Sequence, residues 1–366
     1  MSVAVTVAEL DGLRWAGLRG PRIEVFRALG EQFRAEITEA VHTLPEWPGL
    51  TDYARTDQGL VRLSRLSALT RTRHPREYAE LQAMAAGANL PEQTLLLVNL
   101  RGDLPPPSTT AGCSDLAWPG RALAHNEDGG AGLIGRLLLL TLHCDGDLPV
   151  TALWYPGMLP SNAFALTGHG LAVGLDHLPV AEPAIAPGRH FVARALHRAR
   201  DLDEAIRLLT TLPSAGGFAY NLAELSTGRV AHVEAVAGAS AVQEAGDEPL
   251  WHTNHLRHLT LPELVTLSSR ERAKVLDSLE PPAEPGVDWF LDVLTSAHPR
   301  GVGVNARPRE RVFGSPPGTD DSATLCTCVV DLAAAEFTVL PRGGRRFTCS
   351  VAAALAGPPA GSAPRG

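Results

Sequence analysis

The spacing of apolar residues changes near residue 112, and this change limits the folds that the chain can adopt. In the segment 23–41 the apolar residues recur at helical spacing, so we expect one buried helical face there: Ile23, Phe26, Leu29, Phe33 and Ile37. From residue 121 onward the pattern turns to short β-segments separated by turns, with hairpins expected at 164–175 and 218–235. The spacing therefore predicts an α+β protein whose first part is mostly helical.

The other expected elements follow from the same two periods. Helices are expected at 53–69, 75–87, 191–209, from Ser268 onward with a serine cap, and at 287–295, while 91–100 suits a helix or a strand. Within 191–209, a second helix could start at Asp203-Glu204-Ala205. Strands are expected at 137–144, 149–155, 323–331 and 336–340, the last two as a hairpin. The pair Cys326-x-Cys328 would then place two small buried side chains on one face. The segment 105–110 reads as a loop, and the tail 356–366 has a disordered composition.

The charge and the cysteines of the chain exclude several classes of protein. A net charge of -8 and a pI near 5.9 leave no basic footprint for nucleic acid. The N-terminus lacks a basic start followed by an apolar run, and the apolar runs are too short to span a bilayer. Five cysteines in 366 residues do not make a disulfide framework. We therefore expect free thiols, a cytoplasmic location and no membrane partner.

The stretch AGCSDLAWPGRALAHNEDGG, residues 111–130, contains the first candidate site. The glycine at position 112 allows the chain to bend sharply, so that the thiol of Cys113 can reach the Gly112 carbonyl. Hydrolysis of the resulting thioester would make Cys113 a new N-terminus, whose α-amine has a reference pKa of about 7.7–8.0. Nucleophile and base would then share one residue. The alternative is that Cys113 is a small buried hydrophobic residue.

A second candidate stretch is WHTNHLRH, residues 251–258. His252, His255 and His258 are spaced three apart, which suits metal ligands on one helical face and would give a zinc-type hydrolase. The Thr253-Asn254 pair, however, indicates a strand end or turn. Asn254 can donate a side-chain N–H to the oxygen of a tetrahedral intermediate, a contact worth about 3–4 kcal/mol of transition-state stabilisation. The alternative for Asn254 is a turn-capping role.

Together these stretches resemble the acyl-coenzyme A:6-aminopenicillanate acyltransferase family (peptidase C45), whose members are N-terminal nucleophile hydrolases. The resemblance lies in ordered landmarks: Gly112-Cys113, Asn126-Glu127-Asp128, GHGLAVGLDHL, His252-Thr253-Asn254-His255, Ser269-x-x-Arg272 and Thr324-Leu325. It implies a four-layer αββα sandwich in which 1–112 is the α-chain after self-cleavage and 113–355 carries the nucleophile. It also implies that Asn254 serves the oxyanion.

The expected function is that of a self-processing amidohydrolase or acyltransferase. Cys113 would attack a linear amide or acyl thioester, so the expected partner is a small-molecule acyl amide or acyl-CoA, and Asp128 would hydrogen-bond the freed amine or its turn. Lys274, the single lysine, lies in a polar helical pattern unsuited to pyridoxal phosphate, and we expect no cofactor and no metal. Asp320 and Asp321 stand where penicillin-making members carry an arginine, which argues against a penicillin-type substrate. A non-catalytic, unprocessed binding protein of the same fold remains an alternative.

Overall fold

The computed structural model describes residues 3–105, 112–304 and 322–359. Of the loop expected at 105–110, only Pro105 lies inside these ranges. Asp320 and Asp321 lie outside them, as do residues 360–366 of the tail that we expect to be disordered.

The N-terminal segment begins with a hairpin and continues as a group of helices. The two-residue turn Asp11-Gly12 closes the hairpin, and Gly12 has a φ of 83°, which favours glycine. One helix was expected over 23–41, but the chain breaks at Phe33 and forms two. The elements are β1 Ala4–Leu10, β2 Leu13–Gly20, α1 Arg22–Gln32, α2 Arg34–Thr43, α3 Trp47–Ala54, α4 Asp57–Arg73, α5 Pro75–Ala88 and α6 Glu92–Asn99.

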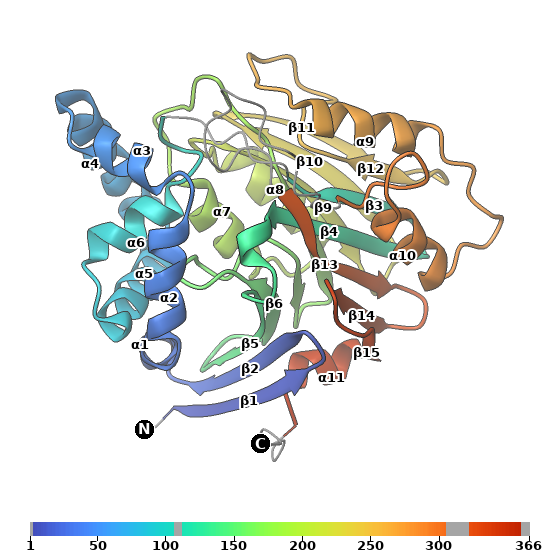
Figure 1. The fold of residues 1–366 in the computed structure, drawn as a ribbon, viewed down its shortest axis with the longest axis horizontal. Coiled ribbons are helices and arrows are strands. Elements are labelled where there is room, and N and C mark those ends of the chain that lie inside the picture. The colour runs from blue at the N-terminus through green and yellow to red at the C-terminus, as the bar shows by residue number, and fades with distance from the viewer. Residues whose placement is uncertain (1–2, 106–111, 305–321, 360–366) are drawn as a thin grey trace.

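Two β-sheets form the centre of the molecule (Figure 1). Within the described ranges, the larger sheet has the order β1-β2-β5-β6-β7-β8-β9-β10-β11 and the smaller has the order β12-β3-β4-β13-β14-β15. The strands after the N-terminal segment are β3 Ser114–Trp118, β4 Ala122–Gly130, β5 Leu138–Cys144, β6 Val150–Trp154, β7 Ala165–Thr167, β8 Leu171–His177, β9 Gly217–Glu224, β10 Val230–Val236, β11 Ala239–Glu244, β12 Leu250–His252, β13 Ser322–Asp331, β14 Glu336–Pro341 and β15 Phe347–Ser350. The remaining helices are α7 Arg189–Leu196, α8 Leu202–Thr211, α9 Leu267–Asp277, α10 Val287–Thr295 and α11 Val351–Ala356, with a short 3-10 turn at Ala131–Leu133.

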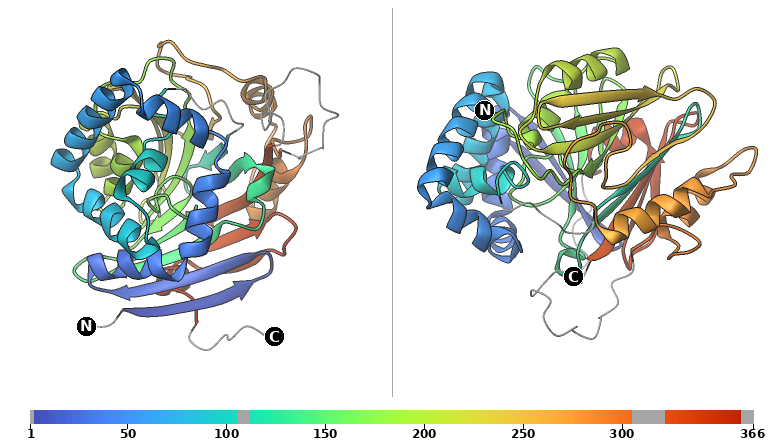
Figure 2. Two further views of the ribbon diagram at one scale, coloured as in Figure 1. Left: turned by 60° about the vertical axis from the view of Figure 1, so that its left-hand side comes forward. Right: turned by 90° about the horizontal axis from the view of Figure 1, so that it is seen from above.

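The layers are those of an αββα sandwich. Strands β3 and β4 of the smaller sheet contact β8 and β9 of the larger one, so the two sheets lie face to face. Helices α7 and α8 cover the outer face of the larger sheet, where their apolar side chains join those of β8, β9 and β10 in one buried cluster. Helices α9 and α10 cover the smaller sheet in the same way. Figure 2 (right) shows these helices on opposite sides of the paired sheets. The α+β prediction and the four-layer sandwich are confirmed.

The N-terminal hairpin belongs to the larger sheet. Strand β2 pairs in parallel with β5, in a register that runs from Arg14 opposite Leu138 to Gly20 opposite Cys144. Helix α1 contacts both strands and crosses α5 so closely that a methyl group on Gly30 or Gly87 would overlap the other helix's backbone. The segment 1–112, predicted as the separate product of self-cleavage, therefore shares one hydrophobic core with the rest of the chain.

Most expected elements are present. The helical span expected at 191–209 is two helices, as the possible second start at 203–205 allowed, because Asp201 caps a new helix by accepting the N–H of Glu204 at 2.7 Å. Helix α9 is capped by Thr266, which accepts from the N–H of Ser269, and not by a serine. The hairpins β7–β8, β9–β10 and β13–β14 are confirmed, and Cys326 and Cys328 are both buried.

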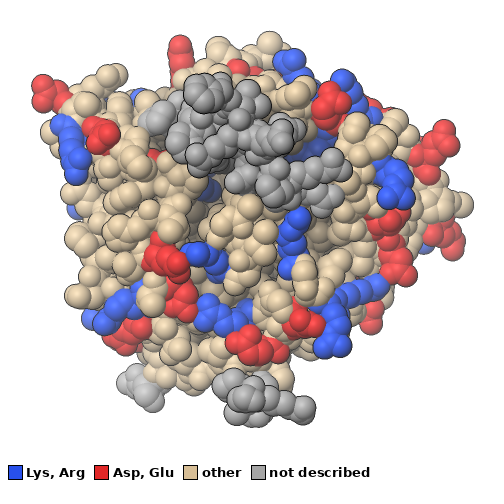
Figure 3. Space-filling model, in the orientation of Figure 1, with Lys and Arg blue, Asp and Glu red and all other residues tan. Residues whose placement is uncertain are grey.

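The surface carries both signs of charge. On the face shown in Figure 3, acidic and basic side chains lie intermixed, and neither sign forms a continuous field. Among the helices of the described ranges, none combines the length and the apolar character that crossing a membrane requires.

Asp103 ties the end of the N-terminal segment to the larger sheet. Its buried carboxylate accepts the backbone N–H of Gly216 at 2.6 Å and that of Arg189 at 3.2 Å. We expect Asp103→Ala to lower the free energy of unfolding by about 2–5 kcal/mol, because two buried N–H groups would lose their acceptor. Denaturant unfolding measures this difference. The exposed Asp247→Ala is the control and should change stability by less than about 0.5 kcal/mol; equal effects of the two substitutions would refute the tether.

Candidate active site

Cys113 lies immediately before β3, where the two sheets face each other. Its side chain is 5% exposed and borders a cavity of about 380 Å³. The cavity has walls from both parts of the chain: Glu36 and Glu39 from α2, Arg101 after α6, and residues 127 to 130 of β4. This volume is within the usual range for a small-molecule site. The thiol is therefore buried, but it is beside a space that a ligand can fill.

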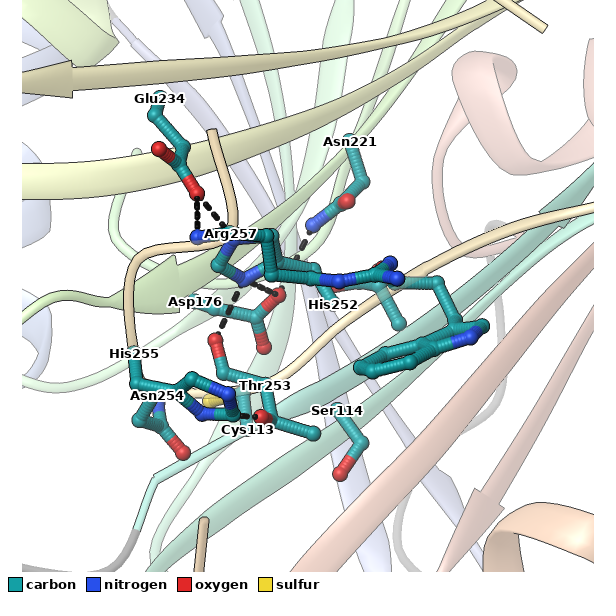
Figure 4. A network of polar contacts seen from close by, with 12 residues as sticks. Cys113, Ser114, Asp176, Asn221, Glu234, His252, Thr253, Asn254, His255 and Arg257 are labelled. Carbon is teal, nitrogen blue, oxygen red and sulfur yellow. Dashed lines mark hydrogen bonds and ion pairs between the residues drawn. The ribbon is translucent and has the colours of Figure 1, made fainter. Parts of the chain in front are cut away.

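Asn254 lies directly against the predicted cleavage point. A methyl group built on Gly112 would overlap the carboxamide of Asn254, and its Nδ2 would be the nearest atom. Figure 4 shows Asn254 next to Cys113, on the segment that follows β12. The Nδ2 of Asn254 donates to the backbone oxygen of His177 at 2.9 Å, which uses one of its two N–H bonds. The second N–H remains for an oxygen at Gly112, and glycine is required there for this close approach.

Arg272 on α9 joins the two halves of this arrangement. Its Nη1 donates to the Cys113 backbone oxygen at 2.5 Å and to Ser114 Oγ at 2.7 Å. Its Nη2 donates to Asn254 Oδ1 at 2.5 Å. This last contact fixes the oxygen end of the carboxamide toward the guanidinium, so the Nδ2 end must face Gly112. Segments more than 130 residues apart in sequence are thus held in one geometry by a buried cation.

Asp128 lines the same cavity as Cys113. Its Oδ1 accepts from Thr324 Oγ1 at 2.5 Å, whereas its buried Oδ2 has no hydrogen-bond partner among the described residues. Burial raises the pKa of this carboxyl to about 7, against the opposing charge of Arg272. A buried carboxylate oxygen with no donor is costly unless a ligand or a new charge satisfies it. The structure thus brings together all four predicted site residues: Gly112, Cys113, Asp128 and Asn254.

His125 on β4 contacts the thiol and was not predicted. Its Nδ1 lies 3.0 Å from Asp115 Oδ2, its Nε2 lies 2.9 Å from Glu127 Oε2, and its ring hydrogen-bonds the thiol of Cys113. The three partners of the ring, Asp115, Glu127 and Cys113, are all buried. Burial opposes the charge of the ring, but Asp115 and the hydrogen bonds from its partners raise the pKa of His125 well above its usual value. Both ring nitrogens therefore carry a proton, and the ring is a buried cation.

The Cys113 thiol, in contrast, favours its neutral form. Burial, together with the negative charge of Glu127, raises the pKa of Cys113, and the hydrogen bond from His125 only partly offsets this. Since a thiolate and not a thiol is the nucleophile, Cys113 holds its proton at neutral pH until a neighbouring group accepts it.

A metal site does not fit these residues. Cys113, His125 and Glu127 offer ligand atoms within 4.8 Å of one another, and they form the one such group in the part of the chain that the structure describes. Both nitrogens of His125 already lie at hydrogen-bonding distance from carboxylate oxygens, so a cation would have to displace one of these contacts. Cys113, His125 and Glu127 therefore form a cluster of hydrogen-bonded side chains.

The zinc site considered at His252, His255 and His258 is wrong. His252 is the last residue of β12, and His255 and His258 lie in the irregular segment after it, so the spacing of three does not place them on one helical face. His252 Nε2 lies 3.0 Å from Glu234 Oε1, and His255 Nδ1 lies 2.8 Å from Ser269 Oγ. Their ligand atoms do not cluster within the described ranges.

Glu234 on β10 instead supports the segment that carries Asn254. Its carboxylate contacts His252 and accepts the backbone N–H of Arg257 at 2.5 Å (Figure 4). It also accepts the backbone N–H of Leu259 at 2.8 Å. Burial acts against this charge, but the hydrogen bonds from His252 and the backbone lower the pKa of Glu234 to about 2. Asn254 is therefore held from one side by Arg272 and from the other by a fixed loop.

Comparison with known proteins gives one family and several distant structures. Residues 118–298 match the family described as acyl-coenzyme A:6-aminopenicillanic acid acyl-transferase. No curated protein matches. Among solved structures, a mutant conjugated bile acid hydrolase from Clostridium perfringens is 10% identical, with a TM-score of 0.39 over 66% of this chain and 93% of that one. A penicillin V acylase from Agrobacterium tumefaciens is 13% identical, with a TM-score of 0.38 over 66% and 86%. The fold assignment stands on this chain's own strand order and layers.

Proposed function

Through residues 118–298 the chain belongs to the acyl-coenzyme A:6-aminopenicillanic acid acyl-transferase family, and from this premise we propose that it is a self-processing cysteine amidohydrolase or acyltransferase. The observation that supports this most directly is the position of Asn254, whose carboxamide nitrogen lies against Gly112 at the cavity beside Cys113. A thiol, a donor for an oxyanion and a space for an acyl group are the parts that acyl transfer requires.

The proposed activation is cleavage between Gly112 and Cys113. The thiol attacks the Gly112 carbonyl carbon, the Gly112–Cys113 bond breaks, and water hydrolyses the thioester. Cys113 then has a free α-amine, which is positioned on the same residue to accept the thiol proton in each later turnover. The unpartnered Oδ2 of Asp128 is a ready acceptor for the new ammonium group, whose charge would in turn favour the ionised form of Asp128.

In turnover, Cys113 takes the acyl group of an amide or thioester. Nδ2 of Asn254 donates to the oxyanion, and Arg272 acts as a positioning residue through its contacts with Asn254 and Ser114. The cavity of about 380 Å³ suits a small-molecule acyl amide or the acyl end of an acyl-CoA. Water or an amine then resolves the acyl-enzyme. A cytoplasmic location remains part of the proposal.

Formation of an acyl-enzyme tests this function. Brief incubation with a panel of acyl p-nitroanilides and acyl thioesters should add the mass of the acyl group to the fragment that begins at Cys113. Because the thiol and not a metal is the reactive group, we expect a chelator to leave the rate unchanged and a thiol alkylating agent to abolish it. Cys144→Ala should label like the wild type. Acylation that survives alkylation, or that a chelator stops, would contradict the proposal.

A non-catalytic protein of the same fold is the remaining alternative. It predicts a chain that purifies uncut and acquires no acyl mass from any member of the panel, although ligands still bind in the cavity.

A further inference from the structure

The uncut chain poses a chemical problem that the freed amine cannot solve. Before cleavage the nitrogen of Cys113 is part of a peptide bond, so it is not a base. The thiol is also in a setting that raises its pKa, with burial as the main cause. The first cleavage therefore needs a proton acceptor that is a side chain. Only later turnovers can use the α-amine.

We propose that Glu127 and His125 form a proton relay that activates Cys113 in the uncut chain. The inference rests on the proposed function and adds the residues that carry out its first step. His125 hydrogen-bonds the thiol on one side of the relay and lies 2.9 Å from Glu127 on the other. The ligand atoms of all three residues lie within 4.8 Å of one another.

The hydrogen-bond partners explain how the relay can take one more proton. With one ring cation between the Asp115 and Glu127 carboxylates, the cluster carries one net negative charge. Asp115 holds Nδ1 at 3.0 Å and fixes the ring, which leaves Nε2 for exchange. Tyr155 donates its hydroxyl to Glu127 Oε1 at 2.5 Å, so Oε2 remains the oxygen that faces the ring.

The steps balance in atoms and protons. Glu127 Oε2 takes the Nε2 proton of His125, and the lone pair freed on Nε2 takes the proton of Sγ. The thiolate attacks the Gly112 carbonyl carbon to form a tetrahedral oxyanion, and the C–N bond to Cys113 then breaks. His125 gives its Nε2 proton to the leaving nitrogen, and Glu127 returns its proton to the ring. The products are a Gly112 thioester on Sγ, a free amine and the relay in its starting state.

Other titratable groups also face this cluster. The groups that face it are Asp115 and Cys113 at β3, Asp128 on β4, Tyr155 after β6, Asp176 on β8, Arg272 on α9 and Cys328 on β13. Burial raises the pKa values of Asp176, Tyr155 and Cys328 well above their usual values, which keeps these groups protonated at neutral pH, and it raises the pKa of Asp128 to about 7. Glu127 is the carboxylate that contacts the ring on the exchanging nitrogen.

The test follows self-cleavage of the full chain after cell-free synthesis, by intact mass against time at fixed pH. We expect Glu127→Gln to slow cleavage by about 100-fold or more, because it removes the proton acceptor and keeps the shape. His125→Gln removes the other group of the relay and should slow cleavage by the same factor. The control is Glu80→Gln, which changes an equally buried carboxylate bonded to Arg194 at 2.8 Å, far from the thiol in sequence and in contacts. It should cleave at the wild-type rate.

Two further readouts separate a relay from a structural role. The rate of Glu127→Gln should rise about tenfold per pH unit, because hydroxide must replace the lost base, whereas the wild-type rate should be nearly flat around neutral pH. Added hydroxylamine should trap the wild-type thioester as a Gly112 hydroxamate, and Glu127→Gln should form this product as slowly as it cleaves.

The outcomes of this test separate a failure of the proposed self-processing from a failure of the relay. A wild-type chain that stays uncut contradicts the proposed self-processing itself. A wild-type chain that is cut, with Glu127→Gln cut equally fast or with Glu80→Gln equally slow, overturns the relay alone. Rapid hydroxamate formation in Glu127→Gln also overturns it, since the block would then lie at thioester hydrolysis.

Discussion

A chain with Cys113→Ala is expected to remain one species at the full mass of 38.8 kDa, while the wild-type chain separates into residues 1–112 and 113–366. We expect no cleavage of the Cys113→Ala chain, because the substitution removes the atom that attacks the Gly112 carbonyl. Peptide bonds do not hydrolyse by themselves in the time that such a preparation takes. Intact-mass spectrometry of the two purified chains, run under reducing conditions, measures it directly.

Cys144→Ala provides the matched control. Cys144 is a free cysteine that is also 5% exposed, but it lies at the end of β5 and does not border the cavity beside Cys113. This variant should be cut like the wild type. An uncut wild-type chain, or a cut at another bond, would contradict the assignment of Gly112 and Cys113 as the cleavage point.

Asn254→Asp is expected to lower the rate of acyl transfer by about 100- to 1,000-fold, the equivalent of about 2.7–4 kcal/mol of transition-state stabilisation. The change preserves the shape of the side chain and its contact with Arg272, but it replaces the N–H donor with an oxygen. That oxygen would repel the developing oxyanion. The loss should appear in kcat more than in KM, because the donor acts on charge that develops only in the transition state.

Asn99→Asp separates this effect from the general cost of a buried acid. The side chain of Asn99 is fully buried and donates to the backbone oxygens of Leu95 at 2.8 Å and Gly157 at 2.9 Å, so it is as constrained as Asn254. Its substitution should reduce stability and leave the rate per folded molecule close to that of the wild type. If Asn254→Asp retains kcat within about threefold, Asn254 is not the oxyanion donor.

Local periodicity predicted most of the fold because most of its elements bury one face. The hairpins at 164–175 and 218–235 and the helix α10 have short-range signals, namely turn glycines and apolar spacing. The parallel pairing of β2 with β5 has no such signal, since it joins strands separated by six helices and two strands of the other sheet. The break at Phe33 was also missed, because the apolar spacing continues through it.

The candidate site also contains some residues that the sequence analysis predicted and others that it missed. Cys113 was predicted from the glycine before it and the loop-forming run upstream, whereas the roles of Asp128 and Asn254 came from the family resemblance. The structure places these residues close together, and their catalytic roles stay predictions. His125 and Glu127 were missed although a signal was present: they are charged side chains on a strand whose every residue from 122 to 129 is buried. Such groups need buried partners, and those of His125 are Asp115 on the neighbouring strand β3 and Cys113 immediately before that strand. Arg272 was noted only as part of the Ser269-x-x-Arg272 landmark, and its contacts with residues 113, 114 and 254 could not be predicted because those acceptors lie far away in sequence.

The register between β2 and β5 has a consequence for how the protein can be made. If each piece were synthesised alone, the larger one would present β5 as an open edge and the smaller one would expose the apolar side of its hairpin, and both would be prone to aggregate. If the chain is cut as proposed, assembly must precede the cut, and attempts to reconstitute the protein from two separately expressed pieces should yield insoluble material.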